Sequence, residues 1–433
     1  MSSRFSTFRD AEQYLEQIPM FSVVGRSAAR MDLSPMKAFC EVMGHPERRL
    51  PFIHVAGTNG KGTVCQMVSS VAIEAGIRTG TYLSPHLLRV NERVQIDGKE
   101  ILNSDILLFF QTFEKELDRI SLTYFELWTC IALWAFDRAN TELAVMETGL
   151  GGRLDATNVI DPLAAAITSV AMDHMDFLGD SLEQIAAEKA GIVKPGVPLV
   201  IGDLDLAAKD VVIKVAENRG SDWQSASDYI VEQTDESVRL NYNMAEISVD
   251  MKERKEVDAI HMAITSSLFS ILRKRYPIPA DTLVRGLERS MERFPEHAHF
   301  QKLHSRLNWY FDGAHNPEAA ESLATQIKKM IPKYGEPSIF FTLMKDKVVP
   351  EWFDPFEENW AMCFVKLPLQ RCAGVGQLKT LNRNLEFREI PMDDERLLEK
   401  LRASKTKLVI FTGSVYFYSQ VKRWMAGLFP NNS

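Results

Sequence analysis

The stretch that decides the fold is His54-Val55-Ala56-Gly57-Thr58-Asn59-Gly60-Lys61-Gly62-Thr63. It follows an apolar run at 52–56 that is typical of a buried strand, and it precedes apolar residues at helical spacing from Val64 to Ala75. Gly76 ends that helix, and Thr79–Leu83 has the pattern of another strand. A strand, a glycine-rich turn, a helix and a strand in succession predict a parallel sheet with helices on its faces.

The turn from Gly57 to Thr63 has the composition of a phosphate-binding loop. Its backbone N–H groups lie beside the positive end of the following helix, where phosphate oxygens bind. Lys61 would reach the terminal phosphates, and the Thr63 hydroxyl would bind Mg²⁺. The common spacing G-x-x-x-x-G-K-[ST] is not met, because Gly62 separates Lys61 from Thr63 and Val55 stands in place of the first glycine. A glycine-rich turn without a ligand is therefore the alternative.

The alternation of strands and helices continues along the chain. Further strands are expected at 143–146, 163–169 and 198–201, and helices at 8–18, 34–43, 124–138, 257–272 and 280–289. Between Asp203 and Val257 the pattern is polar and strand-like, which predicts a small β subdomain at about 203–257. The helical pattern stops near 293–299, and a second alternation follows, with strands at 307–311, 338–342 and 408–411 and helices at 317–330 and 415–424. We therefore expect an α/β chain of two domains, 1–296 and 297–433.

Composition bounds the function. The chain has 433 residues, which also predicts two domains, and its net charge of −8 argues against general nucleic-acid binding without excluding a small anionic ligand. The five cysteines form no C-x-x-C pair, which indicates reduced thiols rather than a disulfide framework or a zinc site. The N-terminus lacks the apolar core of a signal peptide, and no apolar run reaches about 18–20 residues. We expect a cytoplasmic protein without a membrane or nucleic-acid partner.

Motifs along nearly the whole chain resemble those of folylpolyglutamate synthases and dihydrofolate synthases, relatives of the Mur ligases. After the phosphate loop come Ser84-Pro85-His86-Leu87, Asn91-Glu92-Arg93, Thr123-Tyr124-Phe125-Glu126, the run from Glu147 to Asn158, Asp173-His174, the run from Glu188 to Lys194, Asp312-Gly313-Ala314-His315-Asn316-Pro317, Asp346-Lys347 and Thr412-Gly413-Ser414. The resemblance implies a Mur-ligase-like fold, with a P-loop parallel-sheet ATPase domain and a smaller Rossmann-like α/β C-terminal domain that completes the ATP and glutamate site.

The activity that the resemblance implies is ATP-dependent amide ligation. A carboxylate on dihydropteroate or a (poly)glutamyl tetrahydrofolate takes the γ-phosphoryl group of ATP, and the amino group of L-glutamate attacks the acyl phosphate, which gives ADP, phosphate and an amide. Such chemistry needs a triphosphate cradle, metal to neutralise charge, and a closing cleft that excludes water. A monomer is expected for this family.

The resemblance also assigns the metal site. It implies that Mg²⁺ is held, at two sites, by Thr63, Ser84, Glu147, His174 and Lys189. Glu147 ends a predicted buried strand, where its alternative role is to cap local N–H groups. The resemblance implies that Lys189 is carbamylated and so becomes an anionic oxygen ligand; its alternative is an ordinary lysine that pairs with Glu188 or with phosphate. Together with Lys61, Glu147, His174 and Lys189 form the expected catalytic set.

Substrate contacts are expected in both domains. Tyr124 and Phe125 begin a helix, where the resemblance places the folate site; the alternative is that they pack in the core. Arg153 and Asp155 lie on a loop expected to contact substrate or to close over the metal. In the second domain the resemblance implies that Asp312, His315 and Asn316 contact ATP, with a turn satisfied by its own backbone as the alternative. They lie on one loop after a predicted strand.

Two family motifs are altered here. The position of a nucleotide-binding Asn is Ala259, and a Pro-Gly-Arg linker motif is replaced by Pro295-Glu296-His297, with His299 and Lys302 as candidate substitutes for the arginine. These departures keep two alternatives open: a paralogous Mur-like ligase that acts on a non-folate carboxylate, and a nucleotide- or folate-binding protein without turnover.

Overall fold

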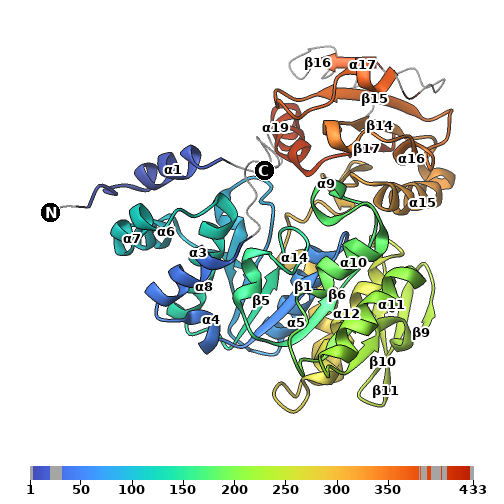
Figure 1. Cartoon of the computed structure of the whole chain (residues 1–433). Helices are drawn as coiled ribbons and strands as arrows, with labels where there is room; N and C mark the ends of the chain where they lie inside the picture. Colours follow the sequence, from blue (N-terminus) through green and yellow to red (C-terminus); the bar gives the residue numbers. More distant parts are fainter. Residues whose placement is uncertain are drawn as a thin grey trace. The chain divides into compact units, whose positions relative to one another are not determined.

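The computed structural model describes residues 3–19, 32–379, 381, 388–391, 401 and 407–429. The chain divides into two compact units (Figure 1): unit 1 comprises Met1–Lys252 and Asp258–Pro295, and unit 2 comprises Glu253–Val257 and Glu296–Ser433. Unit 2 thus begins one residue before the boundary expected from the sequence. It also contains the short segment Glu253–Val257, called the arm below, which no sequence pattern indicated.

Unit 1 is built on a mixed sheet with the strand order β4-β3-β2-β5-β1-β6-β7-β8. Strand β1 lies between β5 and β6 and is parallel to both, as the sequence predicts. The pairs β2–β3 and β3–β4 at one edge are antiparallel, an arrangement that the sequence analysis did not anticipate. The strands are β1 (Phe52–Ala56), β2 (Thr79–Tyr82), β3 (Val94–Ile96), β4 (Lys99–Glu100), β5 (Leu143–Glu147), β6 (Pro162–Ile167), β7 (Leu199–Ile201) and β8 (Trp223–Ser225).

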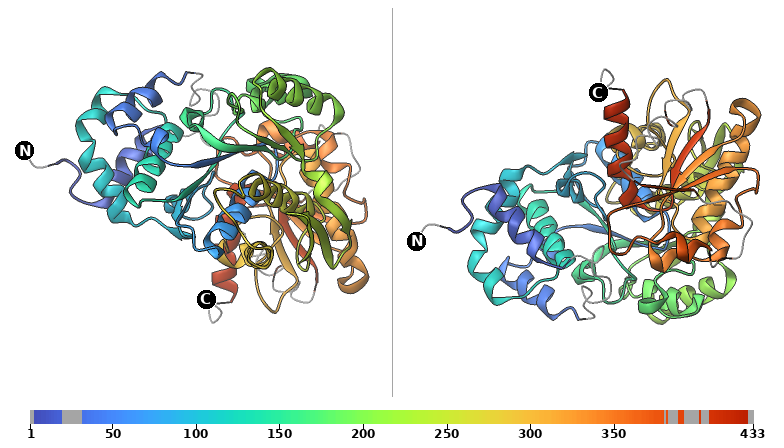
Figure 2. Two further views of the ribbon diagram at one scale, coloured as in Figure 1. Left: turned by 90° about the horizontal axis from the view of Figure 1, so that it is seen from below. Right: turned by 90° about the horizontal axis from the view of Figure 1, so that it is seen from above.

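Helices cover both faces of this sheet. Alternate residues of β1 point to opposite faces: Ile53 and Val55 pack with helices α5, α12 and α13, whereas Phe52 packs with α3, α6 and α8. Farther along that second face, β6 and β7 pack against α10 and α11. Figure 2 shows this layering of unit 1 from two further directions. The helices are α1 (Phe8–Gln17), α3 (Ser34–Val42), α4 (Pro46–Arg49), α5 (Lys61–Glu74), α6 (Asn103–Thr112), α7 (Glu114–Arg119), α8 (Tyr124–Arg138), α9 (Met175–Leu178), α10 (Leu182–Ala190), α11 (Leu206–Asn218), α12 (Asp258–Ile271), α13 (Ala280–Glu288) and α14 (Ser290–Arg293).

The region expected to be a small β subdomain is only partly so. Its first part is the helix α11, capped by the Asp205 carboxylate, which accepts the Ala207 N–H. The expectation of strands there was wrong because Ala208, Val212 and Ala216 form a helical apolar stripe that packs into the core. Strands β9 (Ile230–Gln233), β10 (Ser237–Tyr242) and β11 (Ala245–Asp250) do form an antiparallel sheet. The buried side chains of β10 and β11 belong to the same core as α12, so this sheet has no separate core.

Unit 2 is a second α/β layer structure with the strand order β12-β13-β17-β14-β15-β16. The pair β12–β13 is antiparallel and the other pairs are parallel. Phe341 packs on Trp352 of α16, whereas Phe411 packs on Trp424 of α19, so the two helices cover opposite faces. The elements are β12 (Gln301–Lys302), β13 (Trp309–Asp312), α15 (Pro317–Tyr334), β14 (Ser338–Phe341), α16 (Pro350–Phe353), β15 (Ala361–Lys366), α17 (Val375–Lys379), β16 (Arg388–Pro391), β17 (Val409–Thr412) and α19 (Tyr418–Leu428).

None of the helices in the described part of the chain is both long enough and apolar enough to cross a membrane. All five cysteines are free thiols, and only Cys363 is more than slightly exposed.

Candidate functional site

The expected phosphate loop connects the end of β1 to the start of α5 and is held by the end of β6. The Thr58 N–H donates to the Ser169 carbonyl (2.9 Å), and the Asn59 N–H donates to the Ser169 hydroxyl (2.9 Å). The Thr168 hydroxyl donates to the Asn59 carbonyl. A Cβ atom on Gly57 would lie 1.9 Å from Thr168 Oγ1, so only glycine allows this close approach. The loop is therefore fixed against the sheet edge at several points.

Gly60 makes the turn into α5. It caps the helix with φ +80°, a left-handed conformation that favours glycine, and its carbonyl accepts the first helical hydrogen bond from the Val64 N–H. The N-terminal N–H groups of a helix have no partner within the helix, and its dipole adds positive charge. The end of this 14-residue helix thus supplies the anion-binding geometry that the sequence predicts.

Two lysines converge on the first residue of the loop. Lys61 Nζ donates to the carbonyl oxygens of Gly57 and Thr58, each at 3.0 Å. Lys189 Nζ, from α10, is buried and donates to the same Gly57 carbonyl at 2.9 Å. The structure therefore brings together two of the expected catalytic residues at the Gly57 carbonyl.

Glu147 lies at the end of β5, beside the last part of the loop. Its Oε2 accepts the Ser84 N–H at 2.7 Å, and a Cβ atom on Gly62 would lie 3.6 Å from its Oε1. Burial raises the pKa of Glu147 to about 7, against the opposing effects of Lys61, the Ser84 N–H and Arg93. A carboxylate beside the start of α5 and next to Ser84 agrees with the predicted juxtaposition of Glu147, Ser84 and the loop.

The glycine-rich loop after β5 is tied by Asp155. This buried carboxylate accepts the Gly149 N–H (2.9 Å) and the Leu150 N–H (2.8 Å), and it also accepts the Thr157 hydroxyl. Arg153 forms an ion pair with Glu188 at 2.8 Å and so connects this loop to α10. The structure therefore gives Asp155 and Arg153 roles in holding the loop; substrate contact by either stays a prediction.

Behind this loop, the Thr157 hydroxyl also bonds His54 Nε2 at 2.8 Å. His54 lies on β1 and is fully buried, and this burial, reinforced by Lys194, lowers its pKa to about 3. Because the Thr157 hydroxyl donates to Asp155, the neutral imidazole donates from Nε2 to the Thr157 oxygen. A buried chain of hydrogen bonds thus runs from β1 to the loop after β5.

The two aromatic candidates at the start of α8 have different surroundings. Tyr124 is buried in the core cluster, and the guanidinium of Arg93 lies over its ring, 5.4 Å from the centroid. Phe125 is only partly buried, and its ring lies against Gly149, where an added Cβ would come within 2.5 Å of Cζ. Phe125 is therefore next to the glycine-rich loop that follows Glu147, whereas Tyr124 also has the core role that was the alternative.

His174 caps the short helix α9 from a left-handed conformation with φ +49°. Its backbone N–H is held by the Asp173 carboxylate at 2.7 Å, and its side chain is partly exposed. The role of His174 as a second metal ligand stays a prediction.

The unit 2 candidates lie where β13 ends and α15 begins. The Asp312 carboxylate is buried and accepts the N–H groups of Phe300 (2.8 Å) and Ala314 (3.0 Å). It also pairs with Lys255 of the arm at 3.0 Å, with each side chain only 4% exposed. These contacts make Asp312 the group that fixes this loop and the arm to unit 2.

The other two unit 2 candidates also have local contacts. The Asn316 side chain caps α15 by accepting the Ala319 N–H at 3.0 Å, and His315 Nδ1 lies 3.0 Å from the Gly313 carbonyl. Contact of Asp312, His315 or Asn316 with ATP stays a prediction.

The altered linker motif is fixed within unit 2. Glu296 pairs with Lys422 at 3.2 Å and bonds the hydroxyl of Tyr418, both on α19. Lys302, a candidate substitute for the missing arginine, lies 3.5 Å from Glu253 of the arm. The glutamate that replaces the linker glycine is thus an anchor of the linker on unit 2.

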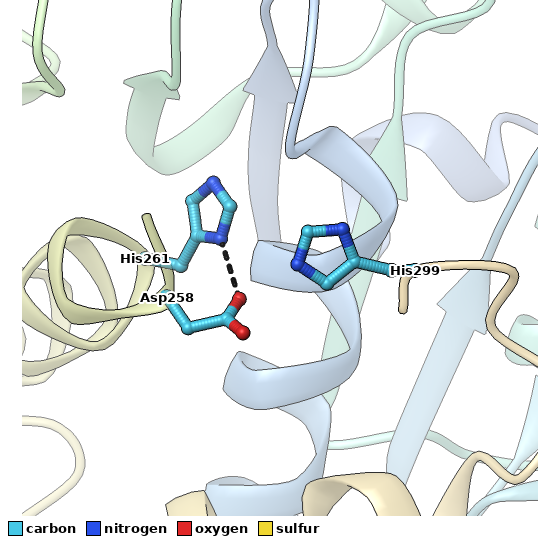
Figure 3. Close-up of side chains that lie close together, drawn as sticks. All are labelled: Asp258, His261 and His299. Atoms are coloured by element: carbon cyan, nitrogen blue, oxygen red, sulfur yellow. Dashed lines mark hydrogen bonds and ion pairs between the residues drawn. The ribbon is translucent and has the colours of Figure 1, made fainter. Parts of the chain in front are cut away.

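Sequence reasoning missed one residue at the phosphate loop, His261 of α12. A Cβ atom on Gly60 would lie 2.2 Å from its Nε2, and its Nδ1 is 3.1 Å from Asp258 Oδ1. Figure 3 shows Asp258 and His261 on the same helix with this hydrogen bond drawn. The available signal was an aspartate and a histidine three residues apart in a helix without other ionisable residues.

Comparisons with known proteins agree with this geometry. The family model of the Mur ligase middle domain matches residues 55–266, which include the loop, Glu147 and Lys189. A dihydrofolate synthase/folylpolyglutamate synthase of Bacillus subtilis is 29% identical over 442 residues, covering 97% of this chain and 99% of the relative. The corresponding Escherichia coli protein is 34% identical over 327 residues, covering 72% of each chain.

Solved structures extend the match to the whole fold. The structure of Escherichia coli FolC in complex with DHPP and ADP is similar with a TM-score of 0.84 and 26% identity, covering 99% of both chains. Mycobacterium tuberculosis folylpolyglutamate synthase, complexed with ADP and AMPPCP, has a similar fold with a TM-score of 0.82 at 24% identity, covering 96% of this chain and 97% of that one. Because the chain is 34% identical to the Escherichia coli relative and covers 72% of its length, it belongs to the dihydrofolate synthase/folylpolyglutamate synthase family.

Proposed function

We propose that this protein is an ATP-dependent ligase that joins L-glutamate to dihydropteroate, to a (poly)glutamyl tetrahydrofolate, or to both. The observation that carries the proposal is the convergence of Lys61, Lys189 and Glu147 on one phosphate loop at the carboxyl ends of β1 and β5. Family membership supports the same reaction, and the alternative of a non-folate ligase has no observation in its favour.

In this proposal the loop binds the triphosphate of ATP. The N–H groups at the N-terminus of α5 face the phosphate oxygens, while the Thr58 and Asn59 N–H groups hold the loop on Ser169. Lys61 exchanges its bonds to the Gly57 and Thr58 carbonyls for the terminal phosphates, where its charge stabilises the phosphoryl group as it moves to the substrate carboxylate. The amino group of glutamate then attacks the acyl phosphate, and phosphate leaves as the amide bond forms.

The residues around Glu147 fit a magnesium ion. Carboxylate and hydroxyl oxygens are the ligands that Mg²⁺ prefers, and a buried carboxylate with its pKa raised to about 7 gains by holding a cation. We propose that Glu147, Ser84 and Thr63 hold one Mg²⁺ and that His174 and Lys189 serve a second. When bound, Mg²⁺ neutralises the charge of the phosphate oxygens.

The protein's own groups shape the rest of the site. The Ser84 N–H orients the Glu147 carboxylate, and the Asp155 network fixes the loop against which Phe125 lies. We propose that the partly buried Phe125 ring stacks on the pterin ring, and that Asp312, His315 and Asn316 act on ATP from unit 2. The cytoplasm as the site of action, supported by the five free thiols, and a monomeric state belong to the same proposal.

The test is ADP release from Mg-ATP with L-glutamate and, separately, dihydropteroate or tetrahydrofolate, with the lengthened folate identified by mass spectrometry. Lys61→Ala should abolish turnover, whereas the exposed Lys115→Ala on α7 should leave it unchanged. Turnover with one acceptor, or with both, decides which of the two activities is present. Absence of ADP release with both acceptors would refute the proposed function.

Carbamylation of Lys189 is tested separately. Protein equilibrated with ¹³C-bicarbonate should show a carbamate resonance by NMR that Lys189→Ala lacks. Lys194→Ala is the control, because Lys194 Nζ also donates to a backbone carbonyl, that of Asn158 at 2.9 Å. A spectrum of the wild type without a carbamate resonance would contradict this part of the proposal.

A further inference from the structure

A histidine that the reaction scheme does not use lies against the turn of the phosphate loop. His261 is only 4% exposed, and the atoms nearest to a Cβ placed on Gly60 are its Nε2 (2.2 Å), Cε1 (2.9 Å) and Cδ2 (3.0 Å). The imidazole edge that carries Nε2 therefore covers Gly60 directly. Since an added methyl group would overlap this edge, His261 occupies the space beside the loop that a larger side chain at position 60 would need.

The orientation of this ring is fixed from its own helix. Asp258, the first residue of α12, is buried, and its Oδ1 lies 3.1 Å from His261 Nδ1 (Figure 3). A carboxylate on Nδ1 holds that nitrogen as a donor and directs the other ring nitrogen to the opposite side. Burial of an imidazole costs free energy unless its polar atoms are satisfied. An aliphatic side chain would fill this space without that cost, so packing alone does not explain the presence of Asp258 and His261.

The contact of this pair with the phosphate loop supplies that explanation. Asn59 is held from one side by Thr168 and Ser169, at the end of β6. Gly60 is covered by His261, which comes from α12, on the face of the sheet that α5 also covers. The two residues that precede Lys61 are therefore held between β6 and α12. Their backbone conformation sets the direction of the first N–H groups of α5, which are the groups that face phosphate.

We propose that His261, oriented by Asp258, is a positioning residue that holds the Gly60 turn in its phosphate-binding conformation. The inference rests on the proposed function, because it assigns His261 to the ATP site of that reaction. It predicts a selective role: the pair determines nucleotide affinity, whereas binding of the folate and of glutamate does not depend on it.

The test compares His261→Ala with the wild type in the full chain. We expect the KM for ATP and the Kd for ADP, measured by isothermal titration calorimetry, to rise about tenfold, and the KM values for the folate and for glutamate to stay within about twofold. His261→Gln places an amide nitrogen near the position of Nε2 and should restore most of the affinity. Asp258→Ala, which frees the ring, should weaken ADP binding in the same direction but by less.

The control is Ser266→Ala, a buried position of the same helix whose hydroxyl donates to the Met262 carbonyl. It should leave ADP affinity unchanged. The proposal would be overturned if His261→Ala bound ADP as tightly as the wild type. It would also be overturned if His261→Ala and Ser266→Ala lost ADP affinity to the same extent. Since ADP binding is measured without the folate, a failure of the proposed ligase activity would be seen separately from a failure of this inference.

Discussion

The arm provides a sharp test of how unit 2 is stabilised. Its ion pairs include Glu253 with Lys302 (3.5 Å), Lys255 with Asp312 (3.0 Å), and Glu256 with Lys329 (3.0 Å). Only the middle pair is buried, with 4% exposure of each side chain, against 59% and 36% for Glu256 and Lys329. The arm therefore offers matched charge pairs that differ mainly in burial.

The perturbation is Asp312→Asn, which leaves the Lys255 ammonium buried without its carboxylate. Removal of one partner of a buried pair costs about 3–5 kcal/mol, whereas an exposed pair contributes about 1 kcal/mol or less. Asp312 also accepts two backbone N–H groups, and an asparagine oxygen can keep only part of these contacts, which favours the upper part of that range. For a unit of about 140 residues, this loss lowers the melting temperature by about 10 °C or more.

The assay is differential scanning calorimetry of the intact chain. We expect Lys255→Met to lower the unit 2 transition by less than Asp312→Asn, because the two backbone donors still compensate the Asp312 charge. The double variant Lys255→Met/Asp312→Asn should lose less stability than the sum of the losses of the two single variants, since both charges of the pair are then removed together. Lys329→Met should shift the transition by no more than about 3 °C. Equal shifts for Asp312→Asn and Lys329→Met would refute the reasoning.

Three further predictions concern the sites described above. His54 has a folded-state pKa of about 3, below the value of about 6.5 in an unfolded chain, so the unfolded chain takes up the proton first and stability is lost as the pH falls from 6.5 toward 3. His54→Gln should therefore reduce the difference in urea unfolding free energy between pH 7 and pH 5 by about 2 kcal/mol; an unchanged difference would contradict the cause given. Gly57→Ala brings a Cβ atom to 1.9 Å from Thr168 Oγ1, so ADP affinity by calorimetry should fall at least about tenfold, whereas Gly427→Ala, with nothing within 4 Å, should bind ADP as the wild type does. Asn316→Ala removes the cap of α15 and should lower unit 2 stability by about 1 kcal/mol, with Asn316→Asp close to the wild type in thermal unfolding; identical melting of the alanine variant would refute the capping role.

Much of unit 1 could be predicted because its signals are local. The run from Phe52 to Thr63 combines a β-strand pattern, glycines and a lysine in one continuous stretch, and the structure has β1, the loop and α5 in that order. The helix α8 was predicted with its bounds from its long apolar run, and in the structure Thr123 and Glu126 cap its N-terminus. At α11 the same reasoning failed, because the region was interpreted as strand-like although Ala208, Val212 and Ala216 recur at helical spacing and pack into the core.

The sequence by itself determined the class of fold and indicated the phosphate loop, because both depend on neighbours in the chain; the residues expected to carry the reaction came from the resemblance of its motifs to a family. The tertiary structure decided what those residues touch. It joined Lys189 to Gly57 across 132 positions and placed the arm, with Lys255, on Asp312 of unit 2. It also laid His261 over Gly60. Such contacts depend on how helices pack on a sheet and on where the chain passes between units, and no periodicity in the sequence encodes either.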